Sequence, residues 1–145
     1  DGRQRLLSLR TTFDQIESRY GVDRHVVAAI WGIESNYGRG QGAFPVVRSL
    51  ATLACRGRRQ AYFRGELFAA LRILQAGHIS SERFIGSWAG SFGQTQFMPG
   101  TFEWIAVDGN DDGRRDLIDT PADALNSAAN YLKKAGWQSG MPWGS

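Results

Sequence analysis

Residues 23–38 read DRHVVAAIWGIESNYG, and their pattern is that of an amphipathic helix with one carboxylate near its end. Asp23 is a typical N-cap residue, Val27 and Ile30 fall at helical spacing, and Gly38 lies beyond the expected C-terminal end. The same periodicity recurs along the chain, whereas the alternation of a half-buried strand does not. The sequence therefore predicts a mainly α protein with one or two short extended pieces near its loops.

Further helices are expected on the C-terminal side of this stretch. The clearest start is at Thr120, where a capping hydroxyl precedes Pro121 and an acid, Asp123, follows three residues later. The expected segments are 45–54, 59–76, a short turn of helix at 80–82, a helix that starts at 99 and includes 102 and 105, and one from 120 to a stop at 136.

The composition is that of a soluble globular protein and predicts one domain over residues 1–145. The chain has 145 residues, 42% of them hydrophobic and 21% charged, with a net charge of +3. Its basic residues are scattered, so we expect no nucleic-acid partner. No apolar run reaches the roughly 18 residues of a membrane-spanning helix, and residues 1–20 lack the order of a signal peptide. The single cysteine, Cys55, is expected to be a buried, inert thiol.

Glu34 is the candidate catalytic residue. On the expected helix it shares a face with Val27, Ile30 and Trp31, where burial and the negative helix end favour a protonated carboxyl. A general acid needs such a proton-holding group. The alternative is an ordinary solvent-facing glutamate at a helix end.

The segment Gly93-Gln94-Thr95-Gln96-Phe97-Met98-Pro99 offers glycine backbone and side-chain amides that can bind sugar hydroxyls. A tight polar turn is the alternative interpretation. Most glycosidases use two carboxylates, but none stands between Glu82 and Glu103. If Glu34 works alone, a hydroxyl of the substrate itself can serve as the nucleophile, with Glu34 acting first as acid and then as base.

An acidic loop follows at residues 108–119. Its side chains match an EF-hand-like calcium loop at positions 1, 3, 5, 7 (through the carbonyl), 9 and 12, which are Asp108, Asn110, Asp112, Arg114, Asp116 and Asp119. Aspartate in place of the usual glutamate at position 12 weakens the match, and a solvated acidic turn without metal is the alternative. Calcium bound here would stabilise the loop, and the bond cleavage itself is expected to require no cofactor.

Several motifs occur in an order that resembles the membrane-bound lytic murein transglycosylase B family. They are Glu-Ser-Asn-Tyr-Gly, Ser-Leu-Ala-Thr-Leu-Ala, Gly-Arg-Arg, Gly-Ser-Trp-Ala-Gly, Gly-Gln-Thr-Gln-Phe-Met-Pro, Val-Asp-Gly-Asn-Asp-Asp-Gly and Ala-Asn-Tyr-Leu, and they cover roughly residues 13–143. The resemblance implies a lysozyme-like helical domain. It also implies cleavage of the β-1,4 bond between N-acetylmuramic acid and N-acetylglucosamine of peptidoglycan, with a 1,6-anhydromuramoyl end and no added water.

The resemblance also implies roles for individual residues. Glu34 matches the acid and base. The positions that match substrate contacts are Ser87 and Gln96 near the scissile bond, Arg58 and Arg59 for lactyl or peptide carboxylates, and Tyr62 and Tyr131 along the cleft. Independently of the resemblance, Tyr37 is an aromatic residue that can pack against a sugar face. Two positions depart from the family pattern, because Phe92 stands where methionine is common and Gly100 replaces a small hydroxyl residue.

The family further implies a bacterial periplasmic or cell-envelope location, peptidoglycan strands as partner, a monomer, and peripheral membrane association of a longer form. Family members are usually longer, so this chain is a short member or a fragment of one. Two alternatives stay open at this stage: a hydrolytic muramidase on the same fold, and a non-catalytic wall-binding or calcium-responsive module.

Overall fold

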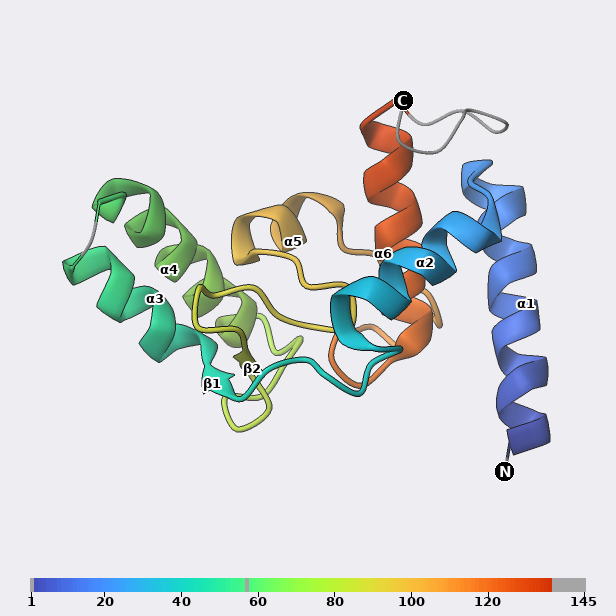
Figure 1. Cartoon of the computed structure of the whole chain (residues 1–145), viewed down its shortest axis with the longest axis horizontal. Coiled ribbons are helices and arrows are strands. Elements are labelled where there is room, and N and C mark those ends of the chain that lie inside the picture. Colours follow the sequence, from blue (N-terminus) through green and yellow to red (C-terminus); the bar gives the residue numbers. More distant parts are fainter. Residues whose placement is uncertain (1, 57, 137–145) are drawn as a thin grey trace.

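The computed structural model describes residues 2–56 and 58–136, and it is built mainly of helices (Figure 1). In chain order the elements are α1 (Gly2–Tyr20), α2 (Arg24–Ser35), β1 (Phe44–Pro45), α3 (Val46–Cys55), α4 (Gln60–Gln75), β2 (Ile85–Gly86), α5 (Pro99–Ile105) and α6 (Pro121–Lys134). The two strands pair antiparallel, with Phe44 opposite Gly86. The mainly α prediction is confirmed, and the extended pieces lie before α3 and after α4.

The helices form two packed groups that meet at one loop. Figure 1 shows the α3–α4 hairpin at one end and α1 at the other, with α2, α5 and α6 between them. One core cluster lies around α3 and α4 and includes Leu50 and Ile73, and the second lies where α1, α2 and α6 meet and includes Ile16 and Leu125. Phe97 packs against both clusters, so the segment that carries it lies at their junction.

The ends of α2 follow the sequence prediction. The Asp23 side chain accepts a hydrogen bond from the backbone N–H of His25 at 2.7 Å, which satisfies a free amide at the start of the helix. The helix stops at Asn36, whose left-handed backbone (φ 50°) turns the chain away. Glu34 therefore lies in the last turn of α2.

The start of α6 differs from the prediction. Pro121 is at the first turn as expected, but the Thr120 hydroxyl makes no capping bond and Asp123 is completely buried. The Asp123 carboxylate instead accepts hydrogen bonds from the backbone N–H groups of Gly109 and Asp116. The predicted capping pair is wrong because the acid binds the loop that precedes the helix.

Three other expectations need correction. Residues 2–20 form α1, which was not predicted, although Leu9, Phe13 and Ile16 recur at helical spacing and pack in the second core. Residues 81–83 form a turn rather than helix. Cys55 is exposed, because it ends α3 on the side away from the buried Leu50. Within the described ranges, α1 included, no helix combines the length and hydropathy that crossing a bilayer requires.

Candidate active site

A pocket of about 350 Å³ opens at the junction of the two cores. Its lining comes from α2, the loop before α5, α5 itself and α6, and consists of Ile30, Glu34, Thr95, Gln96, Phe97, Met98, Thr101, Ala128 and Tyr131. The structure thus brings together three residues that the sequence singled out, namely Glu34, Gln96 and Tyr131. The contributions of Thr101 and Ala128 were missed, since no local pattern distinguishes a pocket wall from a core face.

Glu34 is exposed to solvent at this pocket, which corrects the expectation that burial surrounds it. Val27, Trp31 and Ser35 form the buried stripe of α2, whereas Ile30 and Glu34, one turn apart, form the adjacent stripe at the pocket. The Glu34 carboxylate makes no hydrogen bond or ion pair with the described residues and stays available to a ligand. None of the other lining residues is a carboxylate, so the prediction of a single acid agrees with this lining.

Gln94 joins α2 to the loop that lines the pocket. Its side-chain oxygen accepts from the Trp31 indole N–H at 2.9 Å, and its amide nitrogen donates to the Ile118 carbonyl at 3.0 Å. The Ser35 hydroxyl donates to the Gln94 carbonyl at 2.5 Å and accepts from the Gly38 N–H at 2.8 Å. Gln94 is 5% exposed, so its predicted availability to sugar hydroxyls is wrong. Its role is to position the helix turn that carries Glu34.

Gln96 faces the pocket, and its amide is held by the protein. The side-chain nitrogen donates to the carbonyls of Gln41 (3.1 Å) and Gly93 (2.8 Å), and the oxygen accepts from the Ser91 hydroxyl at 3.0 Å. The Ser91 hydroxyl is in turn 2.7 Å from that of Ser87. Ser87 does not line the pocket, but it is connected to Gln96 through Ser91, a residue that the sequence analysis did not select.

The three candidate tyrosines lie in different places. Tyr131 lines the pocket, with its ring centroid 5.5 Å from that of Phe97. Tyr37 packs edge-on against Trp31 with ring centroids 5.4 Å apart and lies outside the pocket lining. Tyr62 lies on α4, where burial raises the pKa of its hydroxyl and the negative charge of Glu66 acts in the same direction.

The basic pair at the start of α4 also lies away from the pocket. The Arg59 guanidinium carbon is 4.0 Å from the centroid of the Tyr62 ring, whereas Arg58 is exposed and has no hydrogen bond, ion pair or ring interaction with the described residues. An arginine stacked on a tyrosine keeps its hydrogen-bond donors free at the edge of the guanidinium plane. The Arg59–Tyr62 pair can therefore meet a carboxylate, but not one that is bound directly at Glu34.

The two departures from the family pattern have structural explanations. Phe92 is completely buried and packs edge-on against Phe84, with ring centroids 4.8 Å apart, so it fills the core and not the cleft. The backbone N–H of Gly100 donates to the Glu66 carboxylate at 2.6 Å, and a Cβ at this position would come within 2.9 Å of that carboxylate. Glycine at position 100 thus lets Glu66 cap the start of α5.

The acidic loop brings only part of the predicted calcium ligand set together. Carboxylate oxygens of Asp108, Asp112 and Asp123 lie within 4.8 Å of one another, and the Asn110 amide is within hydrogen-bonding distance of the first two. Arg114, expected to contribute its carbonyl, donates from its guanidinium to the His78 carbonyl at 3.0 Å. Asp123 was not predicted as a ligand because it lies beyond the twelve-residue loop.

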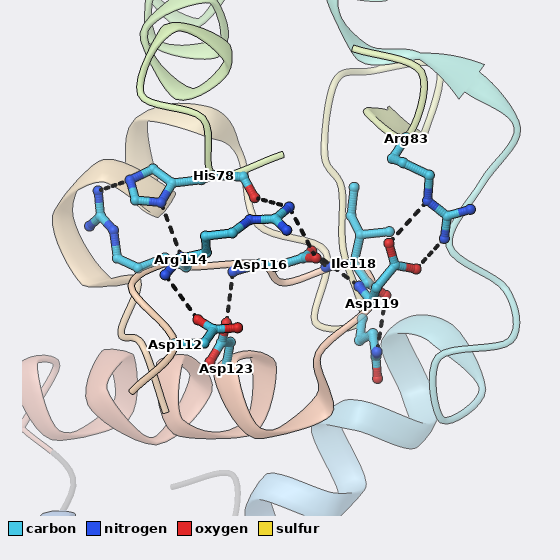
Figure 2. A network of polar contacts seen from close by, with 10 residues as sticks. His78, Arg83, Asp112, Arg114, Asp116, Ile118, Asp119 and Asp123 are labelled. Carbon is cyan, nitrogen blue, oxygen red and sulfur yellow. Dashed lines mark hydrogen bonds and ion pairs between the residues drawn. The ribbon is translucent and has the colours of Figure 1, made fainter. Parts of the chain in front are cut away.

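Positions 9 and 12 of the predicted loop serve other contacts. One Asp116 oxygen accepts the N–H groups of Ile118 (2.9 Å) and Asp119 (3.1 Å) and so fixes the turn. Figure 2 shows Asp119 paired with Arg83, whose Nε donates to it at 3.0 Å, on the side away from Asp112 and Asp123. In the structure Asp119 therefore pairs with an arginine from another segment and does not join the carboxylates of Asp108, Asp112 and Asp123.

Solved structures with the same fold define the class of protein. The chain has a TM-score of 0.92 and 51% identity with SltB3 from Pseudomonas aeruginosa in complex with NAG-NAM-pentapeptide, covering 98% of this chain and 38% of that one. It has a TM-score of 0.88 and 35% identity with the Escherichia coli lytic transglycosylase Slt35 in complex with calcium, covering 93% and 43%. The fold is that of lysozyme-like lytic transglycosylases, as predicted.

The family assignment rests on the whole chain. Residues 1–145 match the model of the Transglycosylase SLT domain, and the chain belongs to this family. It is also 39% identical over 122 residues to the membrane-bound lytic murein transglycosylase B of Escherichia coli (strain K12), which covers 83% of this chain and 34% of that protein. The predicted family is confirmed, and the chain spans about a third of the length of this curated relative.

Proposed function

We propose that this chain is the catalytic core of a peptidoglycan lytic transglycosylase. It would cleave the β-1,4 bond between N-acetylmuramic acid and N-acetylglucosamine and leave a 1,6-anhydromuramoyl end. The observation that carries the proposal is the solitary, unpaired carboxylate of Glu34 in a pocket whose lining holds no second acid. A structure of the similar SltB3 with NAG-anhNAM-pentapeptide supports the anhydro product over the hydrolytic alternative.

In this mechanism one carboxyl group performs both proton transfers. Glu34 donates its proton to the glycosidic oxygen as the bond from that oxygen to C1 of the muramoyl unit breaks. The C6 hydroxyl of the same unit attacks C1, and the Glu34 carboxylate accepts the proton of that hydroxyl. Glu34 ends in its starting state, no water is consumed, and the new C1–O6 bond closes the anhydro ring.

Substrate binding would exclude water from the pocket, which is open to solvent in the free protein. Glu34 is exposed in the structure, but a glycan strand seated over Ile30, Phe97 and Met98 would exclude water from the carboxyl. Loss of water disfavours a bare carboxylate and favours its protonated form, which is the form the first step requires.

The other candidate residues would bind the strand at different distances from the reacting bond. Gln96 and Tyr131 line the pocket and would contact the sugars next to the bond that breaks. Ser87 would contact the strand further along, next to the same loop. Arg59 with Tyr62, together with Arg58 and Tyr37, would act outside the pocket on carboxylates or sugar faces.

The experiment that tests the proposal is product analysis by mass spectrometry. Purified glycan strands digested with this chain should give muramoyl products one water lighter than those of a hydrolytic muramidase. Glu34→Gln should abolish product with an unchanged circular-dichroism spectrum, because it removes the proton but keeps the shape of the side chain. Glu82→Gln, a change at an exposed glutamate outside this pocket, should cleave normally. Activity that survives in Glu34→Gln would overturn the proposal.

We further propose that the acidic loop binds a structural calcium ion through Asp108, Asp112 and Asp123, with Asn110 beside them. Hard carboxylate oxygens suit calcium, and the three side chains lie close enough to share one ion. Burial raises the pKa of Asp123 to about 6, with Asp112 and Asp108 adding to the effect, and a cation would relieve this crowding of like charges. A calcium complex of the similar Slt35 supports the proposal.

The proposed substrate places the protein in the bacterial cell envelope, where its glycan partner is found. We also propose a periplasmic location, a monomeric state and peripheral membrane association of a longer form, as the family resemblance implies. Size-exclusion chromatography with light scattering tests the monomer. Fractionation of cells that produce the full-length protein tests its location.

A further inference from the structure

A second pocket, of about 320 Å³, lies between β1, one face of α3 and the turn that follows β2. Two large aromatic side chains border it and are open to solvent: Phe44 is 52% exposed and Trp88 is 67% exposed. Arg48 and Thr52, one helical turn apart on α3, form its opposite wall. Exposed aromatic groups of this size in a small domain point to a surface that contacts a ligand.

The turn that carries Trp88 is fixed in place. The Ser87 carbonyl accepts from the Gly90 N–H at 3.1 Å, and the Ser87 hydroxyl accepts from the Ser91 N–H at 3.1 Å. Gly90 has a positive φ of 97°, and a Cβ there would come within 2.3 Å of the Leu50 side chain. Because the turn packs directly on α3, the backbone that carries Trp88 is already ordered, and binding would cost little backbone freedom.

The charge of this pocket selects an anionic ligand. Arg48 is the one ionisable side chain among its lining residues, and it makes no hydrogen bond or ion pair within residues 2–56 and 58–136. The rest of the lining is aromatic, aliphatic and hydroxyl-bearing. The matching ligand therefore combines a carboxylate with small apolar groups, which is the chemistry of a short peptide with free carboxylates.

One loop connects this pocket to the one at Glu34. Trp88 belongs to the second pocket and Gln96 to the first, and the hydroxyls of Ser87 and Ser91 form a hydrogen-bonded chain that ends on the Gln96 side-chain oxygen. A strand bound beside Gln96 would continue along this loop toward Trp88. A muramoyl unit of the strand carries its peptide on the lactyl group, so the peptide can reach the second pocket.

We propose that the pocket between Phe44, Arg48 and Trp88 binds the stem peptide of a peptidoglycan strand, and this inference rests on the proposed function. The Arg48 guanidinium pairs with a peptide carboxylate, while the two aromatic rings cover the methyl and methylene groups of the peptide. The pocket thus makes the enzyme prefer peptide-bearing strands over bare glycan.

The test compares two substrates that differ only in the peptide: glycan strands with stem peptides, and the same strands after an amidase has removed them. The wild-type chain should cleave the peptide-bearing strands with the higher kcat/KM. Arg48→Ala should lower kcat/KM on peptide-bearing strands about tenfold, the usual effect of losing a charged hydrogen bond, and leave it unchanged on bare strands. Trp88→Ala should show the same selective loss.

Controls separate this inference from the proposed function. Arg10→Ala removes an exposed arginine of α1 and should affect neither substrate, and thermal melts should show that Arg48→Ala folds normally. An equal loss on both substrates, or no loss on either, would overturn the stem-peptide site while the proposed function stands. If the wild-type chain cleaves neither substrate, the proposed function itself fails.

Discussion

Trp31 and Gln94 lie 63 positions apart in the chain and are joined by a buried hydrogen bond of 2.9 Å from the indole N–H to the side-chain oxygen. This bond connects α2 to the loop that lines the active-site pocket. The same Gln94 amide donates to the Ile118 carbonyl, so one side chain connects three segments. The position of Glu34 relative to Gln96 therefore depends on Gln94, a residue that is itself buried.

Gln94→Ala should destabilise the protein and reduce cleavage together. The change leaves the buried Trp31 N–H without a partner, at a cost of about 1–3 kcal/mol, and removes one of the two hydrogen bonds to the Ile118 carbonyl, which keeps the one from the Gln41 amide. Urea denaturation measures the free energy of unfolding, and the product assay measures kcat. Gln75→Ala, at an exposed glutamine ending α4, is the control and should change neither. A stable but inactive Gln94→Ala variant would instead indicate direct contact with the glycan.

Thr95→Val should raise the free energy of unfolding of the free protein. Thr95 is 3% exposed, and its hydroxyl has no hydrogen-bond partner among the described residues. Replacing an unpaired buried hydroxyl with a methyl group of similar volume should therefore stabilise by about 1 kcal/mol. Thr12→Val is the opposite case, because the Thr12 hydroxyl donates to the Ser8 carbonyl at 3.0 Å, and this change should be destabilising or neutral. Thermal and urea unfolding of both variants check the difference in sign.

Most of the helices after residue 20, and the catalytic candidate, could be predicted because they depend on local patterns. Helical periodicity and the Asp23 cap predicted α2, and the absence of a carboxylate between Glu82 and Glu103 indicated a single-carboxylate site. The exposure of Glu34 could not be predicted in this way. Its helix face borders a pocket completed by α5 and α6, and no pattern within residues 23–38 shows whether a neighbouring helix covers that face.

The roles of several polar side chains could not be predicted, because they depend on contacts with distant segments. Gln94 and Gln96 are equally polar in sequence, yet one is internal and the other faces the pocket. Asp119 and Asp123 are both acids in or next to the predicted calcium loop, but Asp119 forms an ion pair with Arg83, which lies in a distant segment. In each case a contact between residues far apart in the chain decided the role.

The stability of the protein should fall in acid partly through Glu103. Two hydrogen bonds from the Arg72 guanidinium, of 2.7 and 2.8 Å, hold the pKa of Glu103 below its usual value and join α4 to α5. Because the pKa is lower in the folded state, this stabilisation is complete above the unfolded pKa and is lost as the pH falls through the folded one. Both groups are partly exposed, so the contribution is below about 1 kcal/mol.

Glu103→Gln tests this dependence. The variant should be slightly less stable than wild type at pH 7, and the difference should shrink as the pH falls below the ordinary glutamate pKa and through the lowered pKa of folded Glu103, where the wild-type carboxylate becomes protonated. Urea unfolding at several pH values gives the two curves. Parallel curves for the two proteins over this range would show that Glu103 does not contribute to the acid sensitivity.

Calcium should stabilise the protein through Asp112 and Asp123 but not through Asp119. The first two carboxylates share a cluster with Asp108, whereas Asp119 is paired with Arg83. Calcium at 100 times its dissociation constant should raise the free energy of unfolding by about 2.7 kcal/mol. Asp112→Asn, at an exposed position, and Asp123→Asn should reduce or abolish the calcium-dependent rise in Tm, whereas Asp119→Asn should retain it. A rise that disappears only in Asp119→Asn would instead restore the twelve-residue EF-hand assignment, and binding isotherms for the three variants would show which carboxylates hold the ion.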